Sequence, residues 1–469
     1  RGVAVVALKT GSSAIGSDLT LSHTGSLSGS NELYEALFAR CGVISVTNPS
    51  QFLETLKLLC VLEAPKGARV AGFTCSGGGA TMLADYAETI GLSFPGVNPD
   101  DRQALAALLP PIATVSNPLD YTTPIWGQPE QTYPVFAKAI AAMNADMAVL
   151  VQDYPAPGLD ASKGYYQQDA AAFARAAQEA GLPAVICATL PENLDLETRE
   201  FLIAQGVAPM QGIHETLNAM RDAARWAQAR DRIALSPPAP LLRAGCVADQ
   251  HMLTEDEGKA WLAHRGIAVP VGRCVASQQA ATTANEIGYP VALKMMSAHL
   301  AHKTEAGAVV LNLVDAHSVS EALPRMIRDV TAFNATAVTD RFLIEAMSPP
   351  PLAELIVALR DDPQFGPALV LGSGGILVEL VGDAVTLLLP ATASDIADAL
   401  HSLRIARLLD GFRGRQKADI GQIAETLHSL CLAYLNDRAT VAEIEINPMF
   451  LYPDQIVAVD ALIQRYVTP

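Results

Sequence analysis

Short apolar runs alternate with helical segments between residues 68 and 234, and this alternation constrains the fold more than any other feature. The runs DMAVLV at 146–151 and AVICA at 184–188 are almost wholly apolar, and helical segments lie around 168–180 and 215–230. Such runs are typical of strands in a parallel sheet that helices cover on both faces. The alternation therefore predicts a doubly wound α/β sheet with right-handed crossovers.

The start of the chain shows the same alternation of apolar runs and helical segments, with fewer elements. Strands are expected at 3–8 (VAVVAL) and 43–46 (VISV), with one helix from about Asn31 and an amphipathic helix over 50–62. These elements are half of an α/β layer. The prolines of LSPPAPLLRAG, residues 235–245, exclude regular structure and indicate a linker.

The pattern of predicted helices and strands changes after about residue 253. TEDEGKAWLAHRGIAV predicts an amphipathic helix capped by Thr254, and strand-like runs with glycine turns follow. Residues 441–462, VAEIEINPMFLYPDQIVAVDAL, predict a closing hairpin that carries carboxylates. This part is expected to be α+β. The predicted domains are two α/β segments at 1–64 and 65–234, a linker at 235–250 and an α+β domain at 251–469.

Charge and cysteine usage exclude several classes of function. The net charge is −17, with no basic run, so nucleic acids and membranes are not expected partners. Any phosphate-bearing ligand must then be held by helix N-termini, lysines or Mg²⁺. The seven scattered cysteines are typical of a reduced cytoplasmic protein, neither a disulfide framework nor a zinc site. No secretory signal or 18-residue apolar span is present.

Several side chains have two interpretations each. His23 lies in SHTGSLSGS, with no acid or thiol beside it, and is either a solvated loop histidine or a chemical group. Lys294 lies near the end of an apolar run, where a lysine either extends to water or holds phosphates as a point charge. Glu345 and Glu354 flank AMSPPPLA. That stretch is either a solvated loop or a hinge that meets an adenine while an acid takes the ribose hydroxyls.

Acidic residues near the C-terminus suggest a metal. Glu443, Glu445 and Asn447 alternate, which places them on one face of a strand, and Asp460 is expected on the partner strand. Three acids and an amide on one surface are costly unless a cation joins them. Oxygen ligands of this kind suit Mg²⁺, which ordinarily also takes substrate phosphates.

The stretch CSGGGATML predicts a strand, a glycine loop and a helix in succession. The backbone N–H groups near Ser76, Gly77 and Gly78, together with the helix dipole, could hold a phosphate. The stretch is not a GxxxxGK[ST] loop, and glycine turns after strands are common, so it carries little weight alone.

Together these stretches resemble the NDP-forming acyl-CoA synthetases, relatives of succinyl-CoA synthetase and ADP-forming acetyl-CoA synthetase. The resemblance rests on LSHTGSLSGSNELYEALFARCGVI, SGGG, SNPLDYT, IGYPVALKMMSAHLAHKTEAGAVVLNL, LRDDPQFGPALVLGSGGILVEL and EIEINPMF with AVDALI. It implies flavodoxin-like domains followed by an ATP-grasp domain. It also implies an acid–thiol ligase that forms acyl-CoA, ADP and phosphate from a carboxylic acid, CoA and ATP through an acyl phosphate.

The resemblance further implies roles for individual residues. His23 is identified as the phosphohistidine, and His302, in AHKTE, is either a second phosphate carrier or a structural loop histidine. Glu445 is expected close to the transferring phosphate. The remaining implied roles are Lys294 on ATP phosphates, Glu345 and Met347 at the adenosine hinge, Glu354 near the ribose, and Asn447 and Asp460 on Mg²⁺.

The loop NPLDYTTPIWG bears on the acid substrate. Tyr121 and Trp126 stand where smaller residues are expected in acetate-type members of the family. If this loop, with Asp120, lines the acid pocket, it favours a bulky or aromatic acid such as a hydroxycinnamate, because a ring can stack on the indole. Simple packing within the loop is the alternative.

The sequence also departs from the family pattern. The CoA-binding Rossmann domain, the front half of the domain with His23, and the glutamate that orients the phosphohistidine are all missing. We therefore expect that the missing parts, roughly 200 residues or about one and a half typical domains, lie elsewhere in the full protein or in a partner chain. A homo-oligomer is also expected. Two other hypotheses stay open: an ATP-grasp carboxylate–amine ligase, which leaves His23 and the parallel domain unused, and a non-catalytic module that senses nucleotide or acyl-CoA.

Overall fold

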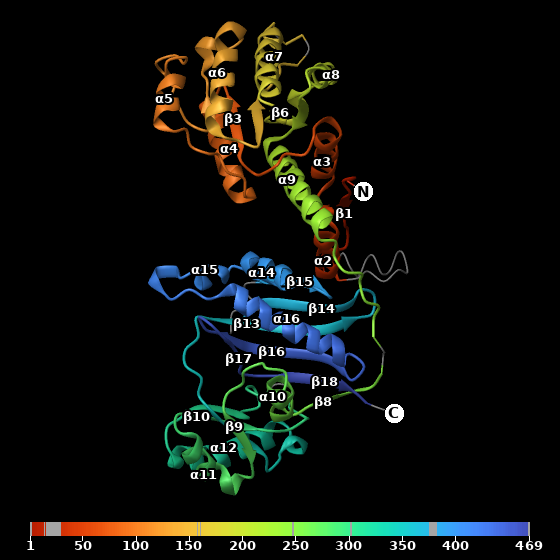
Figure 1. Cartoon of the computed structure of the whole chain (residues 1–469), viewed down its shortest axis with the longest axis vertical. Coiled ribbons are helices and arrows are strands. Elements are labelled where there is room, and N and C mark those ends of the chain that lie inside the picture. Colours follow the sequence, from red (N-terminus) through yellow and green to blue (C-terminus); the bar gives the residue numbers. More distant parts are fainter. Residues whose placement is uncertain are drawn as a thin grey trace. The chain divides into compact units, whose positions relative to one another are not determined.

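The computed structural model describes residues 2–13, 15, 30–156, 158–159, 161–245, 248–300, 303–374 and 382–467. The chain divides into two compact units (Figure 1). Unit 1 holds the described residues of 1–28 together with 38–238, and unit 2 holds those of 29–37 together with 239–469. The first half of helix α2 (Asn31–Cys41) thus belongs to unit 2.

Unit 1 is built on a five-stranded sheet whose neighbouring strands are all parallel. The strand order is β4-β3-β5-β6-β7, which is the flavodoxin-like order 2-1-3-4-5 when the strands are counted within the sheet. This confirms the predicted doubly wound fold. The strands are β3 (Val70–Thr74), β4 (Leu119–Asp120), β5 (Met147–Val151), β6 (Ala184–Ala188) and β7 (Ala208–Gln211), and a separate parallel pair joins β1 (Val6–Leu8) to β2 (Ile44–Val46).

Hydrophobic cores lie on both faces of this sheet. Ala148 and Leu150 of β5 belong to one core, whereas Met147 and Val149 belong to the other. Two covered faces explain why β3, β5 and β6 are buried at every position and read as unbroken apolar runs. The further helices of unit 1 are α3 (Pro49–Val61), α4 (Gly77–Ile90), α5 (Pro99–Ala106), α6 (Pro129–Met143), α7 (Lys163–Glu179), α8 (Leu196–Ala204) and α9 (Ile213–Leu235).

Unit 2 contains two antiparallel sheets with helices, as the α+β prediction requires. The smaller has the order β11-β10-β12-β9, and the larger has the order β15-β14-β13-β16-β18-β8, with β17 paired to β16. The strands are β8 (Gln250–Met252), β9 (Gly272–Val275), β10 (Val291–Met295), β11 (Val309–Leu313), β12 (Phe342–Ala346), β13 (Ala353–Asp362), β14 (Gly366–Ser373), β15 (Ala384–Leu388), β16 (Val441–Leu451), β17 (Ile456–Ala458) and β18 (Leu462–Tyr466).

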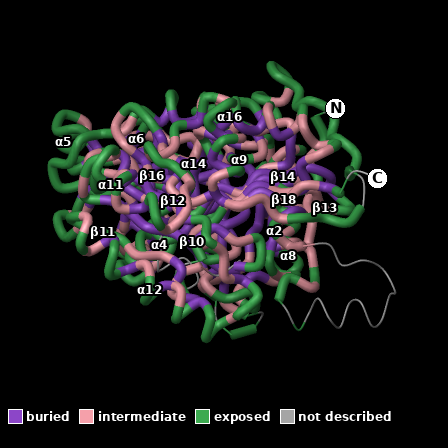
Figure 2. The backbone as a smooth tube through the Cα atoms, turned by 90° about the horizontal axis from the view of Figure 1, so that it is seen from below, coloured by how far each residue is buried: buried purple, intermediate pink, exposed green. Residues whose placement is uncertain are grey.

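Each sheet of unit 2 has its own core. Met326 and Val330 of α12 pack with the smaller sheet, and Leu427 and Cys431 of α16 pack with the larger one. Strand β14 of the larger sheet is mostly buried (purple in Figure 2). The helices are α10 (Glu255–Ala263), α11 (Ala280–Ile287), α12 (Ala316–Phe333), α14 (Ala393–Ser402), α15 (Ala406–Leu409) and α16 (Ile420–Asp437).

Two local predictions in unit 2 are confirmed and one is wrong. Thr254 is the N-cap of α10, and its N–H donates to Glu257 Oε2 at 2.9 Å. In β16, Ile444 is buried in the core while Glu443 and Glu445 are half-buried, as the alternation predicts. Asp460, however, lies in the bend between β17 and β18 and not on a strand.

Among the described residues, no helix combines the length and the apolar character that crossing a membrane demands.

Candidate functional site

Lys294 lies in the interior of unit 2. All five residues of β10 are buried, and Lys294 is only 5% exposed. Strand β10 pairs with β11 on one side and with β12 on the other, so the lysine is central in the smaller sheet. The interpretation of Lys294 as a solvated strand-end lysine is therefore wrong, because carboxylates meet its ammonium group inside the protein.

A continuous set of ion pairs surrounds Lys294, and we call it the charge ladder. Lys294 Nζ lies 2.5 Å from Glu255 Oε1 and 3.1 Å from Glu345 Oε2. Lys259 Nζ lies 2.8 Å from Glu255 Oε1 and 2.6 Å from Glu345 Oε1. Lys303 contacts Glu255 and lies 2.9 Å from Asp460 Oδ1. The charge ladder thus consists of three cations and three anions: Glu255, Lys259, Lys294, Lys303, Glu345 and Asp460.

The charge ladder holds its central groups ionised although they are buried. Burial by itself raises the pKa of Glu255, but Lys294, Lys259 and Lys303 outweigh it and keep that pKa far below its usual range. Burial likewise lowers the pKa of Lys294, but Glu255 and Glu345 raise it well above the usual value. The pKa of Lys259 is lowered by burial and by the neighbouring Lys294. At neutral pH Lys294 and Glu255 are therefore both charged.

The stretch between β12 and β13 has the position expected of a hinge. Glu345 is the penultimate residue of β12 and is buried in the charge ladder, so it is not part of a solvated loop. Met347 follows the strand, and its N–H donates to Pro290 O at 3.0 Å. Glu354 is the second residue of β13, and its carbonyl accepts from Gly374 N at 2.7 Å. The adenosine role of these three residues stays a prediction.

Oxygen donors gather beside the charge ladder. Asn447 is exposed on the same face of β16 as Glu445, and Val459 N donates to Pro448 O at 3.2 Å, which brings the Asp460 bend to this end of the strand. Carboxylate and amide oxygens fit Mg²⁺. Within the described part of the chain, however, His, Cys, Asp and Glu side chains form no group of three or more that could hold a metal ion. Mg²⁺ at Asn447 and Asp460 would therefore need nucleotide oxygens as further ligands.

In unit 1 the predicted glycine loop forms the junction between β3 and α4. Ser76 is the N-cap of the 14-residue helix α4, with no side-chain cap hydrogen bond, and Gly77 is the first helical residue. A Cβ added at Gly77 would lie 3.6 Å from Asp120 Oδ2. The structure therefore brings Ser76, Gly77 and Asp120 together at the carboxyl ends of β3 and β4, which is where doubly wound sheets bind ligands.

The loop after β4 contains a strained residue. Thr122 has φ 68° and ψ 150°, a conformation that is costly for a β-branched side chain. Its N–H donates to Asp120 Oδ1 at 2.9 Å, whereas its buried hydroxyl and the buried Trp126 Nε1 have no hydrogen-bond partner among the described residues. Strain and unpaired polar groups of this kind concentrate at functional sites.

Tyr121 and Trp126 differ in their surroundings. Tyr121 is fully buried, and its hydroxyl donates to Asp169 Oδ2 at 2.9 Å. Asp169 also accepts from Gly127 N at 3.0 Å, so Tyr121 anchors the loop and leaves no surface for an acid. Trp126 is half-buried, with its ring 4.7 Å from Tyr166 and 5.4 Å from Tyr165 between centroids.

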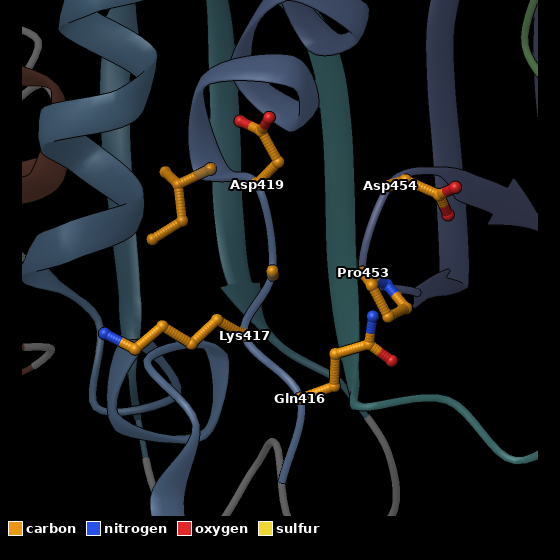
Figure 3. A pocket seen from close by; sticks show the side chains of 7 residues that line it. Gln416, Lys417, Asp419, Pro453 and Asp454 are labelled. Carbon is orange, nitrogen blue, oxygen red and sulfur yellow. The ribbon is translucent and has the colours of Figure 1, made fainter.

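Two hollows in unit 2 differ in their relation to these residues. One of about 720 Å³ is lined by 416–420 with Pro453 and Asp454 (Figure 3). It is open to the surface, and none of the predicted site residues lines it. The other, of about 20 Å³, is lined in part by Glu255 and Lys303. The smaller hollow therefore lies against the candidate site.

Comparisons with known proteins identify both parts of the chain. The family model described as an ATP-grasp domain matches residues 246–464, and the one described as a succinyl-CoA ligase-like flavodoxin domain matches residues 1–59. The beta subunit of ADP-forming acetate–CoA ligase I from Pyrococcus furiosus is 33% identical over 46% of this chain and 92% of that subunit. The chain belongs to the family of ADP-forming acyl-CoA synthetases.

Two further proteins are similar to this chain. A trans-feruloyl-CoA synthase from an unidentified prokaryote is 29% identical over 98% of this chain and 65% of its own length, so this chain spans about two thirds of that relative. A dinucleotide-forming acetyl-coenzyme A synthetase from Candidatus Korarchaeum cryptofilum, solved with coenzyme A and Ca-AMPCP, is 33% identical over 45% of this chain and 93% of that one, with a TM-score of 0.43.

The two histidines predicted as phosphate carriers lie outside the described residues. His23 falls in 16–29 and His302 in 301–302. Their roles therefore rest on the sequence resemblance alone and stay predictions.

Three members of the charge ladder were not predicted from the sequence: Glu255, Lys259 and Lys303. Glu255 lies in the acidic first turn of α10, which the sequence explains sufficiently as a helix start. Its spacing of four residues from Lys259 was the available signal, but such pairs are common on solvated helix faces. Only the packing of α10 beside β10 and β12 distinguishes this pair.

Proposed function

We propose that this chain provides the ATP-grasp and phosphohistidine parts of an ADP-forming acyl-CoA synthetase, which makes acyl-CoA, ADP and phosphate from a carboxylic acid, CoA and ATP. The observation that carries the proposal is a buried, charged lysine beside exposed oxygen donors in a unit that matches the ATP-grasp family, with a succinyl-CoA ligase-like segment in the same chain. The named relatives are CoA ligases, which favours this function over a carboxylate–amine ligase or a sensing module.

The proposed reaction passes one phosphoryl group to two acceptors in turn, His23 and the acid, before CoA takes the acyl group. A ring nitrogen of His23 attacks the γ-phosphorus of ATP, and ADP leaves. A carboxylate oxygen of the acid then attacks the phosphohistidine and takes the phosphoryl group, which restores His23. Finally the CoA thiol, losing its proton, attacks the carbonyl carbon of the acyl phosphate and releases phosphate.

The residues of unit 2 would bind and orient the nucleotide. Lys294, with Lys303 beside it, would hold the phosphates as point charges. Glu345, Met347 and Glu354 are proposed for the adenosine. Asn447 and Asp460 would hold Mg²⁺, which neutralises charge on the transferring phosphoryl group when bound, and Glu445 lies on the same face of β16 as Asn447.

The residues of unit 1 would receive the phosphoryl group and the acid. The N–H groups at the start of α4, at Gly77 and Gly78, are proposed to hold phosphate together with Ser76, whose own N–H donates to Thr74 Oγ1 at 3.2 Å. CoA itself, and any partner chain or further domain that binds it, belongs to the same proposal. We also propose that the protein forms a homo-oligomer and is located in the cytoplasm.

Phosphate labelling tests the proposed function. Full-length protein incubated with Mg-ATP should acquire an acid-labile, base-stable phosphate that ADP removes, because a phosphoimidazole is a high-energy N–P bond. We expect His23→Ala to abolish the label and His299→Ala, an exposed histidine near His302, to leave it unchanged. If His23→Ala labels as well as wild type while His302→Ala also labels fully, the phosphohistidine mechanism is wrong.

The proposed acid is bulky or aromatic. The half-buried indole of Trp126, close to Tyr165 and Tyr166, offers ring surface for stacking, and one relative is named a trans-feruloyl-CoA synthase. We expect Trp126→Ala to lower kcat/KM for a hydroxycinnamate by about 5- to 150-fold, the loss of a pocket contact worth about 1–3 kcal/mol, with acetate unaffected.

A second tryptophan of unit 1 provides the control for this comparison. Trp226, on α9, packs against Arg230, and Trp226→Ala should leave both acids unchanged. Equal losses for acetate and the hydroxycinnamate in Trp126→Ala would assign Trp126 to loop packing and remove it from the acid site.

A further inference from the structure

Glu255 pairs with more lysines than the other two carboxylates of the charge ladder do. Its carboxylate contacts all three lysines: Lys259 and Lys294 through Oε1, and Lys303 through Oε2. Glu345 contacts two of the lysines and Asp460 contacts one. Glu255 is 4% exposed, so bulk solvent has little access to these contacts. It is therefore the main internal anion for the cations that the proposed function places on phosphate.

Among the described residues, the hollow that Glu255 and Lys303 line is small. The hollow next to Glu255 and Lys303 measures about 20 Å³, which is room for about one water molecule. Carboxylate oxygens already contact Lys294 and Lys303, so a phosphate oxygen that binds either lysine competes with them. Two anions cannot share the same ammonium groups without strong repulsion in a site with little water.

Lys294 can exchange this partner without losing its place. Its Nζ also donates to Val459 O at 3.1 Å and lies 3.1 Å from Glu345 Oε2, so two contacts remain when Glu255 withdraws. Lys303 is more accessible than Lys294, and its second contact is the partly exposed Asp460. The geometry thus permits exchange at Lys294 and Lys303 while Lys259 stays with Glu345.

We propose that Glu255 is a positioning residue that occupies the phosphate-binding lysines in the absence of nucleotide and competes with the phosphates for them. The proposal rests on the proposed function, which assigns Lys294 to phosphate. It predicts that Glu255 weakens the binding of polyphosphates in exchange for keeping the lysines charged and in place. A residue with a merely structural role would not weaken ligand binding.

The test is the affinity for tripolyphosphate, which carries the phosphate charges without adenosine, measured by calorimetry on the full chain. We expect Glu255→Gln to bind it at least about tenfold more tightly than wild type, a change of about 1.4 kcal/mol. Asp256→Asn is the matched control, because it removes the same charge one residue along the helix from a side chain that pairs with Arg341, outside the charge ladder. Its affinity should equal that of wild type.

A conservative variant covers the case in which Glu255→Gln does not fold. Glu255→Asp keeps the charge but shortens the side chain, so it should bind tripolyphosphate more tightly than wild type and less tightly than Glu255→Gln. Unchanged or weaker binding in the folded variants, or an equal gain in Asp256→Asn, would overturn the proposal. Absence of Mg-ATP labelling with the tripolyphosphate gain intact would instead reject the proposed function and leave the competition standing.

Discussion

Lys294→Met should lower the rate of Mg-ATP-dependent phosphorylation by at least about a hundredfold, because it removes a charged phosphate contact from a site with little water. It should also destabilise the protein by about 3–5 kcal/mol, because Glu255 and Glu345 then lose a buried counter-charge. Urea unfolding and single-turnover labelling measure the two effects separately.

A charge-balanced double variant separates catalysis from stability. Lys294→Met with Glu255→Gln leaves two lysines facing two carboxylates in the charge ladder. We expect this variant to regain most of the lost stability, since no buried charge is unpaired, while phosphorylation stays as slow as in Lys294→Met. Recovery of the labelling rate in the double variant would show that Lys294 is only a counter-ion.

Asn447→Ala should raise the Mg²⁺ concentration needed for half-maximal phosphorylation and slow the reaction by about a hundredfold or more, because an oxygen ligand of the ion is lost. Asn447 is the decisive position, since it is exposed on β16 and stands outside the charge ladder. Asp460→Ala should have a similar effect on phosphorylation, but it also removes a contact of Lys303. Rates measured across a series of Mg²⁺ concentrations test both variants.

Glu443 supplies the matched control for the magnesium site. It lies on the same face of β16 but opposite Arg360 of β13, and the family resemblance gives it no ligand role. Burial and the neighbouring Glu445 raise its pKa, whereas Arg360 lowers it. Glu443→Gln should change the Mg²⁺ requirement less than Asn447→Ala. Unchanged ATP kinetics in the Asn447→Ala/Asp460→Ala pair would reject the magnesium assignment.

The sequence by itself determined those features that depend on neighbours along the chain. The alternation of Glu443, Ile444 and Glu445 fixes opposite faces of β16 whatever the strand packs against. Apolar runs between helical segments likewise determined the parallel sheet of unit 1, and Thr254 with Glu257 determined the start of α10. The family motifs also lie within contiguous stretches, which is why the family could be predicted from the sequence.

Only the tertiary structure decided which charges meet. Glu345 and Lys259 are 86 residues apart in sequence, and Lys303 and Asp460 are 157 apart, so no local pattern links them. The surroundings of Tyr121 also depend on a distant residue. Its hydroxyl donates to Asp169, 48 residues away in sequence, so the hydroxyl is not available to an acid substrate. A side chain's ionisation and its access to a ligand depend on burial and on the charges around it. Both are set by the packing of distant elements, and so Glu255 became a candidate only once α10 was placed beside β10 and β12.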